Sequence, residues 1–353
     1  MTRLRIGTRG STLALWQAHH IAERLAQLHG IETEIVRIRT SGDRMQSAPV
    51  AQISEQIGAE SGGKGIFIKE LEDALLANTV DLAVHSMKDV PTEIPAGLAF
   101  PAITRREDPR DCLISRSGRS LKGLPTGSLV GTSSLRRQAQ LRHNRADLEA
   151  LDLRGNVDTR LKKLDAGEFD AIVLAVAGVN RLGATARVTQ VMNADVMLPA
   201  VGQGALGIET RTGDAATSKL VAALDDADSR ACVTAERALL HELQGGCQVP
   251  LGAWARLVKS SLLGGRSFNS DIHHEEKTGA LAPEEDNTRA SESVEILIEA
   301  GVFSADGKEF LRREHRSPAS DPAGAGKRLG QILLEAGADR ILRLAGRSVG
   351  QKR

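Results

Sequence analysis

The sequence predicts an α/β protein with two similar lobes in tandem, each built on a mainly parallel central sheet, followed by a small α+β domain. Three observations carry this prediction. The first hundred residues alternate short apolar runs with helical patterns, the alternation starts again near Pro101, and its character changes after about Leu224. Such alternation is typical of sheets covered by helices. A chain of 353 residues is also long for a single hydrophobic core.

In the first lobe, predicted strands and helices follow one another closely. Ser11 has a side chain suited to cap a helix. A second helix is expected after Ile68. The apolar residues at helical spacing on these two helices are Ile21, Leu25, Leu28, Ile68, Leu71 and Leu75. The predicted strands are Leu4 to Gly7, Glu34 to Ile38 and Asp81 to His85.

The second lobe repeats this pattern. A strand ending at Gly131 runs into Thr132, Ser133 and Ser134 and then a helix from Leu135. A strand at about 148–153 and a helix with Val157, Leu161 and Leu164 on one face come next, and the apolar run from Ala171 to Val176 is typical of a strand buried on both faces. A ligand cleft is therefore expected between the two lobes.

The predicted third domain combines helices with short strands. A helix is expected from Cys232 to Leu243 and another from Leu329 to Ala336. Strands are expected at about 253–258, 294–298 and 310–314. The polar stretch between Gly264 and Glu292 shows no apolar period, so we expect a surface excursion or a disordered loop.

Cys247 occupies an unusual position in this domain. It lies between a predicted helix and a predicted strand, beside Gly245 and Gly246, with Pro250 at the exit. The glycines permit positive φ angles and leave the sulfur unshielded. Free cysteines are usually small buried hydrophobes. From position alone, Cys247 is either such a residue or a covalent attachment point.

Composition excludes several classes of protein. Lys and Arg (46) nearly balance Asp and Glu (45), so no overall field attracts nucleic acid or an anionic membrane. Two Trp, six Phe and no Tyr offer little for stacking on bases. Three widely spaced cysteines argue against a disulfide framework or a zinc site, and His273 and His274 in the polar stretch are interpreted as solvated. Without an apolar signal segment or a membrane-spanning run, a cytoplasmic setting is expected.

Arginines gather at the turns that follow the predicted strands. In open α/β sheets these turns line the ligand crevice, and helix N-termini reinforced by guanidinium groups bind carboxylates or phosphates. For any single arginine, a solvated surface position is the alternative. The residues are Arg9, Arg136, Arg137, Arg154, Arg160 and Arg181.

The run from His85 to Pro91 places a cation and a carboxylate side by side at a strand end. Lys88 and Asp89 form either a surface ion pair of little energetic value or part of a site. In the second case, Asp89 stabilises a developing positive charge and Lys88 holds an acid group. Spacing alone does not choose between the two.

Several long motifs, taken together and in order, resemble those of the hydroxymethylbilane synthase family, also called porphobilinogen deaminases. The similarity is collinear from Arg5 to about Arg256 and resumes more weakly near Val294. The motifs are Arg9 to Gln17, His85 to Pro91, Gly131 to Arg137, Arg154 to Leu161, Leu198 to Gly204 and Gly245 to Pro250.

The resemblance implies an activity. Enzymes of this family are transferases that join four porphobilinogen molecules head to tail, release ammonia at each step, and hydrolyse off the linear tetrapyrrole hydroxymethylbilane. The chain grows on a dipyrromethane cofactor held by a thioether, which by motif is attached to Cys247. Asp89 matches the family carboxylate that contacts the pyrrole N–H groups and stabilises the cationic azafulvene. Lys88 is assigned to the catalytic residues with it and matches a position that binds acetate and propionate side chains.

The same resemblance implies the groups that hold cofactor and substrate. Each pyrrole carries an acetate and a propionate, and arginine forks suit carboxylates better than lysine does. The implied cofactor-binding residues are Cys247, Asp89, Lys88, Thr132, Ser133, Arg136, Arg137 and Arg154. The implied substrate-binding residues are Arg9, Ser11, Phe67, Arg154, Arg160 and Arg181.

The family fold has two lobes like the periplasmic binding proteins. It implies a first lobe at 1–104 with a return segment at about 200–222, a second lobe at 105–199, and a cysteine-bearing domain at 223–353. The polar stretch at about 264–292 departs from the compact family pattern and is interpreted as an insertion in this third domain. A monomer is expected, with no metal, nucleic acid or membrane partner. The chief rival is a non-catalytic two-lobed anion-binding protein, and a nucleic-acid binder comes third.

Overall fold

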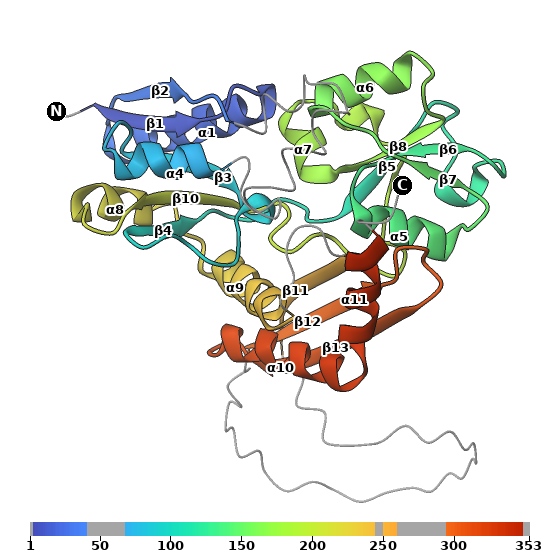
Figure 1. Ribbon diagram of the computed structural model, residues 1–353. Coiled ribbons are helices and arrows are strands. Elements are labelled where there is room, and N and C mark those ends of the chain that lie inside the picture. The colour runs from blue at the N-terminus through green and yellow to red at the C-terminus, as the bar shows by residue number, and fades with distance from the viewer. Residues whose placement is uncertain (1–2, 41–67, 244–249, 260–293, 349–353) are drawn as a thin grey trace, which may run out of the picture.

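The computed structural model describes residues 3–40, 68–243, 250–259 and 294–348 of the chain. Two α/β lobes lie side by side, and a third domain packs against both of them (Figure 1). Each of the three has its own sheet. The predicted α/β class, with two lobes and a small α+β domain, is confirmed. The predicted insertion at 264–292 lies outside the described residues.

The first lobe contains a five-stranded sheet in the order β2-β1-β3-β10-β4. β1 is parallel to β2 and β3, whereas β10 is antiparallel to β3 and β4. The strands are β1 (Leu4–Thr8), β2 (Thr33–Arg37), β3 (Leu82–Ser86), β4 (Leu98–Ile103) and β10 (Leu206–Arg211). The chain thus enters this sheet a second time, after the second lobe.

The second lobe contains a sheet of the same size in the order β7-β6-β8-β5-β9. β6 is parallel to β7 and β8, whereas β5 is antiparallel to β8 and β9. The strands are β5 (Asp111–Ser115), β6 (Leu129–Gly131), β7 (Glu149–Leu151), β8 (Ala171–Ala175) and β9 (Gln190–Val191). The apolar run predicted as a buried strand is therefore the central strand β8.

Both sheets are mainly parallel, as expected, although each is mixed because it contains one antiparallel strand. In each lobe, one strand runs against the others, and it is the strand that arrives from the other lobe: β5 follows β4, and β10 follows β9. A crossover helix returns the chain to the same end of a sheet, but a segment from the neighbouring lobe enters at the opposite end. The apolar pattern of the strands carries no information on this direction. The domain limits given above stay a prediction.

Helices cover both faces of the first sheet, because successive strand residues point to opposite sides. Leu82 and Val84 lie in one apolar cluster with α1 (Thr12–His29). Ala83, between them, lies in the cluster of α4 (Lys69–Leu76) on the other face. The remaining helices of the two lobes are η1 (Met87–Asp89), η2 (Leu121–Gly123), α5 (Leu135–Asn144), α6 (Val157–Asp165), α7 (Val176–Arg181), η3 (Thr185–Arg187) and α8 (Ala215–Ala222).

The predicted start of the first helix is confirmed. The Ser11 hydroxyl accepts the N–H of Ala14 at 3.3 Å, which is the capping interaction expected of serine. Ile21 and Leu25 are fully buried, as their spacing predicted. Leu28 is 46% exposed, so the expectation that it shares the buried face was wrong. It lies in the last turn of α1, beyond the edge of the core.

The third domain is an antiparallel sheet packed against helices. Its strands, in the order β11-β12-β13, are β11 (Leu251–Lys259), β12 (Val294–Phe303) and β13 (Phe310–Pro318). Its helices are α9 (Ala227–Glu242), α10 (Pro322–Glu335) and α11 (Ala338–Ser348). α9 and α10 cross closely at Gly326, where a Cβ atom would lie 2.0 Å from the carbonyl oxygen of Ala235.

The turn between β12 and β13 docks on the end of α5 in the second lobe. Arg142 donates to the carbonyl of Ala305 at 2.7 Å, and Nδ1 of His143 lies 3.1 Å from the carbonyl oxygen of Gly307. Gly307 has a φ angle of 74°, and a Cβ there would lie 2.7 Å from a backbone atom of α5. This position therefore requires glycine.

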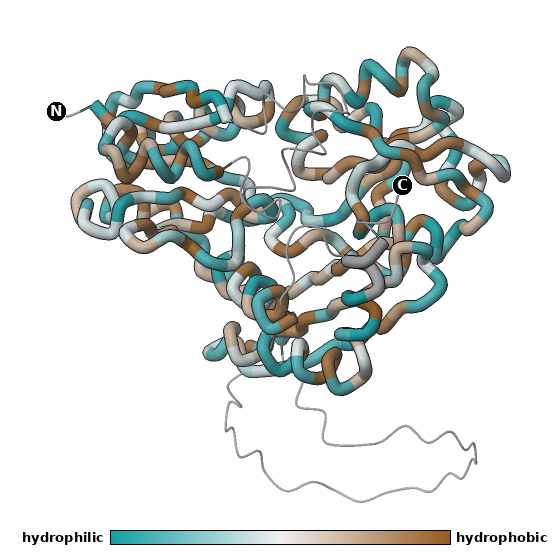
Figure 2. Tube along the Cα trace, viewed as in Figure 1, coloured by the Kyte–Doolittle hydropathy of each residue, from teal (hydrophilic) through white to brown (hydrophobic). Residues whose placement is uncertain are grey.

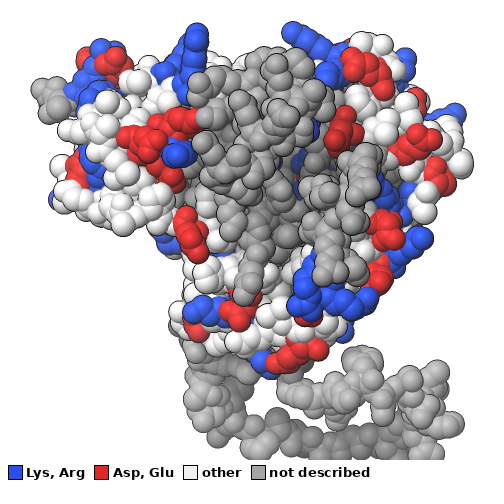
Figure 3. Space-filling model, in the orientation of Figure 1, with Lys and Arg blue, Asp and Glu red and all other residues white. Residues whose placement is uncertain are grey.

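Polarity follows this layering. Figure 2 shows hydrophobic residues along the central strands and hydrophilic residues on the outer turns. Figure 3 shows Lys and Arg side chains interspersed with Asp and Glu over both lobes and the third domain. Of the helices in the described ranges, none combines the length and the apolar character that crossing a membrane requires.

Candidate active site

The candidate site begins at the turn that follows the buried strand β3. Lys88 and Asp89 lie on η1, whose first N–H, that of Met87, donates to the carbonyl of Ala205 at 3.0 Å. Pro91 disfavours helical geometry for the residue before it, so the turn ends there. Met87 is buried, whereas Lys88 is half-buried and Asp89 is exposed. The turn thus presents an ammonium and a carboxylate to the space between the lobes.

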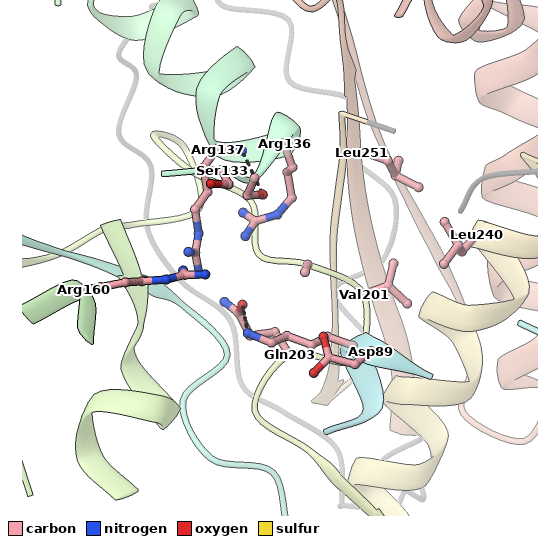
Figure 4. A pocket seen from close by; sticks show the side chains of 12 residues that line it. Asp89, Ser133, Arg136, Arg137, Arg160, Val201, Gln203, Leu240 and Leu251 are labelled. Carbon is pink, nitrogen blue, oxygen red and sulfur yellow. Dashed lines mark hydrogen bonds between the residues drawn. The ribbon is translucent and has the colours of Figure 1, made fainter. Parts of the chain in front are cut away.

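The N-terminal end of α5 lies across from this turn (Figure 4). Ser134 caps the helix by accepting the N–H of Arg137 at 3.4 Å. Arg136 and Arg137 project from the first helical turn toward the cavity. The Ser133 hydroxyl lines the same cavity, is buried, and has no hydrogen-bond partner within the described part of the chain. A buried hydroxyl without a partner is costly unless a ligand supplies one.

Both arginines of α5 are held by a carboxylate that sequence reasoning missed. Asp111, at the start of β5, is fully buried and accepts from Arg136 at 2.7 Å and from Arg137 at 2.7 and 3.2 Å. Burial alone would raise the pKa of Asp111, but the two guanidinium groups outweigh it and hold that pKa well below its usual range. Two cations share one anion, so the cluster keeps a net positive charge.

Gln203, in the return segment before β10, was also missed. Its amide nitrogen donates to Asp111 at 2.8 Å and to the carbonyl of Pro109 at 2.6 Å. These two acceptors fix the orientation of the amide, so its oxygen faces Lys88 and accepts from the ammonium at 3.4 Å. Gln203 therefore connects the buried arginine cluster to the turn that carries Asp89.

Arg160 and Arg181 line the cavity from the second lobe. Arg160 on α6 donates to the carbonyl of Gly155 at 2.8 Å, and Arg181 at the end of α7 donates to the carbonyl of Gly204 at 2.6 Å. Burial lowers the pKa of each guanidinium to about 10, so both stay charged at neutral pH. The guanidinium of Arg181 also lies 5.9 Å from the ring centroid of Trp16 in the first lobe.

The side chains described so far enclose adjoining cavities. One has a volume of about 300 Å³ and lies between η1, α5 and the third domain. A second, of about 250 Å³, lies between the lobes. Lys88, Asp89, Arg137, Arg160 and Gln203 line both of them. Asp89 also lines a third, smaller cavity beneath the turn, so it lies where the three meet.

Four other predicted site residues take different positions. Arg9 and Ser11 line the cavity between the lobes, although the Ser11 hydroxyl also caps α1. Thr132 is fully buried, and its hydroxyl accepts the N–H of Ser134 at 3.3 Å rather than lining the cavities above. Arg154 is exposed and lies outside the walls of those cavities.

Two predicted residues lie outside the described residues: Phe67 and Cys247. The described chain ends at Leu243 and resumes at Pro250, on either side of the segment with Cys247. Leu240 on α9 and Leu251 on β11 both line the 300 Å³ cavity. The described elements that flank the cysteine segment therefore border the same space as Asp89 and the arginines.

The remaining titratable groups sharpen this arrangement. Burial lowers the pKa of Lys88 to about 8, although the neighbouring Asp89 acts in the opposite direction. Burial raises the pKa of Cys112 to about 12 and that of Cys232 to about 11, so both thiols are unreactive at neutral pH. Within the described ranges, no group of three or more His, Cys, Asp or Glu side chains is placed to hold a metal ion.

Family comparisons agree with this site. Residues 4–219 match the family model of the porphobilinogen deaminase dipyrromethane cofactor binding domain, and residues 230–265 match its C-terminal domain. The chain belongs to the porphobilinogen deaminase family. A relative named porphobilinogen deaminase, from Syntrophotalea carbinolica, is 44% identical over 340 residues, which cover 96% of this chain and 95% of the relative. The resemblance seen in the motifs is confirmed.

Solved structures give weaker likenesses. The methionine binding protein MetQ is 14% identical with a TM-score of 0.39, over 63% of this chain and 89% of its own. A periplasmic substrate-binding protein of an ABC transporter from Coxiella burnetii is 14% identical with a TM-score of 0.37, and the match covers 63% of this chain and 91% of that protein. TM-scores of this size do not by themselves establish a shared fold.

The residues present fit the dipyrromethane group for which this porphobilinogen deaminase domain is named. Dipyrromethane carries carboxylate side chains, and the site offers ammonium and guanidinium groups around the 300 Å³ cavity. The Ser133 hydroxyl, which has no hydrogen-bond partner among the described residues, can donate to an acceptor in that cavity. Among the described residues, Asp89 supplies the one carboxylate that lines both cavities, and it could accept from pyrrole N–H groups there.

Proposed function

We propose that this chain is a hydroxymethylbilane synthase, a transferase that condenses four porphobilinogen molecules head to tail and hydrolyses off the linear tetrapyrrole. Each condensation forms a carbon–carbon bond, breaks the carbon–nitrogen bond to the departing ammonia, and releases a pyrrole proton. The observation that carries the proposal is the position of Asp89, where a surplus of cations surrounds one exposed carboxylate. Family membership supports the same reaction.

The cofactor role falls to the side chains around the 300 Å³ cavity. Cys247 is the proposed thioether tether, and Lys88, Ser133, Arg136 and Arg137 bind carboxylates of the cofactor. When bound, dipyrromethane supplies a nucleophilic pyrrole carbon on which the chain is extended. Thr132 acts through the backbone of Ser134, and Arg154 is proposed for both cofactor and substrate from its exposed position.

Asp89 is the proposed catalytic carboxylate. Positive charge develops on the substrate as the carbon–nitrogen bond breaks, and an oriented anion stabilises that charge more in the transition state than in the ground state. Lys88 and Arg160 stand beside it and hold acid side chains without competing for the pyrrole N–H groups. The remaining proposed substrate ligands are Arg9, Ser11, Phe67 and Arg181.

We further propose a cytoplasmic monomer that acts on a small molecule and binds neither nucleic acid nor membrane. The balance of 46 basic and 45 acidic residues supports this, because such a chain has no strong overall field. We also propose lobe limits of 1–104 with 200–222 and 105–199, and a third domain at 223–353. The mixed sheets support the return segment, since β10 pairs with β3 and β4.

Intact-protein mass spectrometry of the purified chain tests the function. We expect an adduct with the mass of two linked pyrroles on the wild-type chain and none on Cys247→Ser. Cys232→Ser is the matched control, because this thiol is buried, and it should keep the adduct. A wild-type chain that stays at its bare mass after incubation with porphobilinogen would instead indicate a non-catalytic anion-binding protein.

A further inference from the structure

Arg237 of the third domain contacts the turn that carries Asp89. Its guanidinium donates to the backbone carbonyls of Val90 (2.9 Å), Pro91 and Thr92 (3.3 Å). These are the three residues that directly follow Asp89 in the sequence. A planar fork with five N–H donors can hold several carbonyl groups at once, whereas an ammonium acts as a point charge.

The segment that Arg237 holds has little other regular support. Residues 90–93 belong to no helix or strand. Pro91 has no N–H to donate, and the N–H of Val90 donates to Met87 at a long 3.3 Å. The position of Asp89 relative to the cavity therefore depends on what restrains the chain just after it, and Arg237 supplies that restraint from another domain.

Neighbouring residues of α9 show that this contact belongs to a larger docking surface. Glu236 is fully buried and accepts from Arg106 at 2.7 and 3.0 Å and from the N–H groups of Gly202 and Ala255. Val233, one turn earlier, lies in the apolar cluster that includes Met87 and Val90. α9 thus holds the return segment through Glu236 and the Asp89 turn through Arg237.

We propose that Arg237 is a positioning residue for Asp89. It sets the place of the carboxylate through the backbone of residues 90–92, and it does so from the helix that leads into the segment with Cys247. The domain to which Cys247 belongs in sequence would then also fix the position of the reacting carboxylate. This inference rests on the proposed function.

The chain offers a matched control for a merely structural role. Arg230 lies on the same helix, is also half-buried, and also donates to two backbone carbonyls of the first lobe, those of Phe100 (3.2 Å) and Pro101 (2.9 Å). It pairs in addition with Asp225. Within the described part of the chain, Arg230 makes no hydrogen bond or ion pair with residues 87–92. Replacement of Arg230 therefore measures how much stability is lost when α9 loses a contact with the first lobe, while the contacts of the Asp89 turn remain unchanged.

The test compares purified Arg237→Gln, Arg237→Lys and Arg230→Gln with the wild-type holoenzyme. Cofactor loading is measured by intact-protein mass. The kinetic constants kcat and KM are measured with porphobilinogen as substrate, and stability is measured by thermal unfolding. We expect Arg237→Gln to load the cofactor and to lose about 10- to 100-fold in kcat, because small misplacements of a catalytic group have effects of this order. KM should change by less than about threefold, and Arg237→Lys should recover part of kcat. Arg230→Gln should lower stability as much as Arg237→Gln with kcat nearly unchanged.

Equal kcat values for the loaded forms of Arg237→Gln and Arg230→Gln would overturn the inference. If Arg237→Gln does not fold, the kcat of Arg237→Lys against wild type decides in the same way. Amide hydrogen exchange at residues 87–92 separates this inference from the proposed function. A wild-type chain without adduct or turnover refutes the function, whereas unchanged exchange in Arg237→Gln refutes the positioning role whatever the activity.

Discussion

Replacement of Asp111 by asparagine should destabilise the protein strongly. The carboxylate is fully buried, and it accepts from Arg136, Arg137 and Gln203 at 2.7 to 3.2 Å. Both guanidinium groups are 5% exposed, so water cannot replace the lost anion. Removal of one member of a buried ion pair costs about 3–5 kcal/mol, because it leaves an uncompensated buried charge. The folding equilibrium should therefore fall by roughly 10²- to 10⁴-fold.

Denaturant unfolding checks this magnitude, with Asp165→Asn as the control. Asp165 pairs with Arg187 at 2.5 Å, but the two side chains are 56% and 41% exposed, so its loss should cost less than about 1 kcal/mol. The midpoint of Asp111→Asn should fall with little change in the denaturant slope. A cost below about 1 kcal/mol for Asp111→Asn would refute the buried-charge argument.

The effect of Asp111 should also depend on pH in a defined direction. Its arginine partners hold its pKa in the folded chain below the ordinary value of 3.8, so the stability it contributes is fully present above pH 3.8 and is lost as the pH falls. The difference between wild type and Asp111→Asn should accordingly be constant from neutral pH down to about 4 and shrink below it. A difference that grew in acid would show that the carboxylate is protonated in the folded protein.

Two further predictions concern the cavity itself. Asp89→Ala should leave the free energy of unfolding unchanged, because the side chain is exposed. It should lower kcat by at least about 10²-fold, because the carboxylate acts on charge that develops in the transition state. Near-normal turnover would contradict this role. The cofactor-free chain should load its adduct more slowly as the pH rises through about 8, because the half-buried Lys88 loses its charge there. The loading rate should fall by up to about tenfold at pH 9. Lys88→Arg should remove this pH dependence, as followed by intact mass over time, and a dependence that persisted would point to another group.

Local chemistry made much of the fold predictable. Ser11 capped a helix, helical spacing placed Ile21 and Leu25 in the core, and the apolar run 171–176 became the central strand β8. Each of these outcomes depends on neighbours within a few residues. The prediction that Leu28 is buried was wrong, because the helical spacing of apolar residues continues past the point where the sheet ends. The sequence of a helix does not record how far the sheet beneath it extends.

Strand direction and the buried carboxylate were not predictable in this way. β5 and β10 run against their neighbours because each arrives from the other lobe, which is a property of the whole path of the chain. Asp111 meets Arg136 and Gln203, which are 25 and 92 residues away. A lone aspartate after a Pro-Arg dipeptide gives no sign of such partners.

The partner of Arg136 and Arg137 changes the interpretation of the arginines as a group. If Arg136 and Arg137 were separate carboxylate ligands, their guanidinium groups would repel one another in a buried cluster. Each would also carry the cost of burying an unpaired charge. Asp111 offsets this repulsion and leaves about one net positive charge at the end of α5, while Gln203 carries the restraint on to Lys88. Arg181 donates to Gly204 in the return segment, and Arg237 donates to residues 90–92 after the Asp89 turn. The second lobe and the third domain are thus each hydrogen-bonded to a segment of the first lobe that borders the site. Opening of the lobes would therefore have to break hydrogen bonds that orient the site, such as that between Arg181 and Gly204.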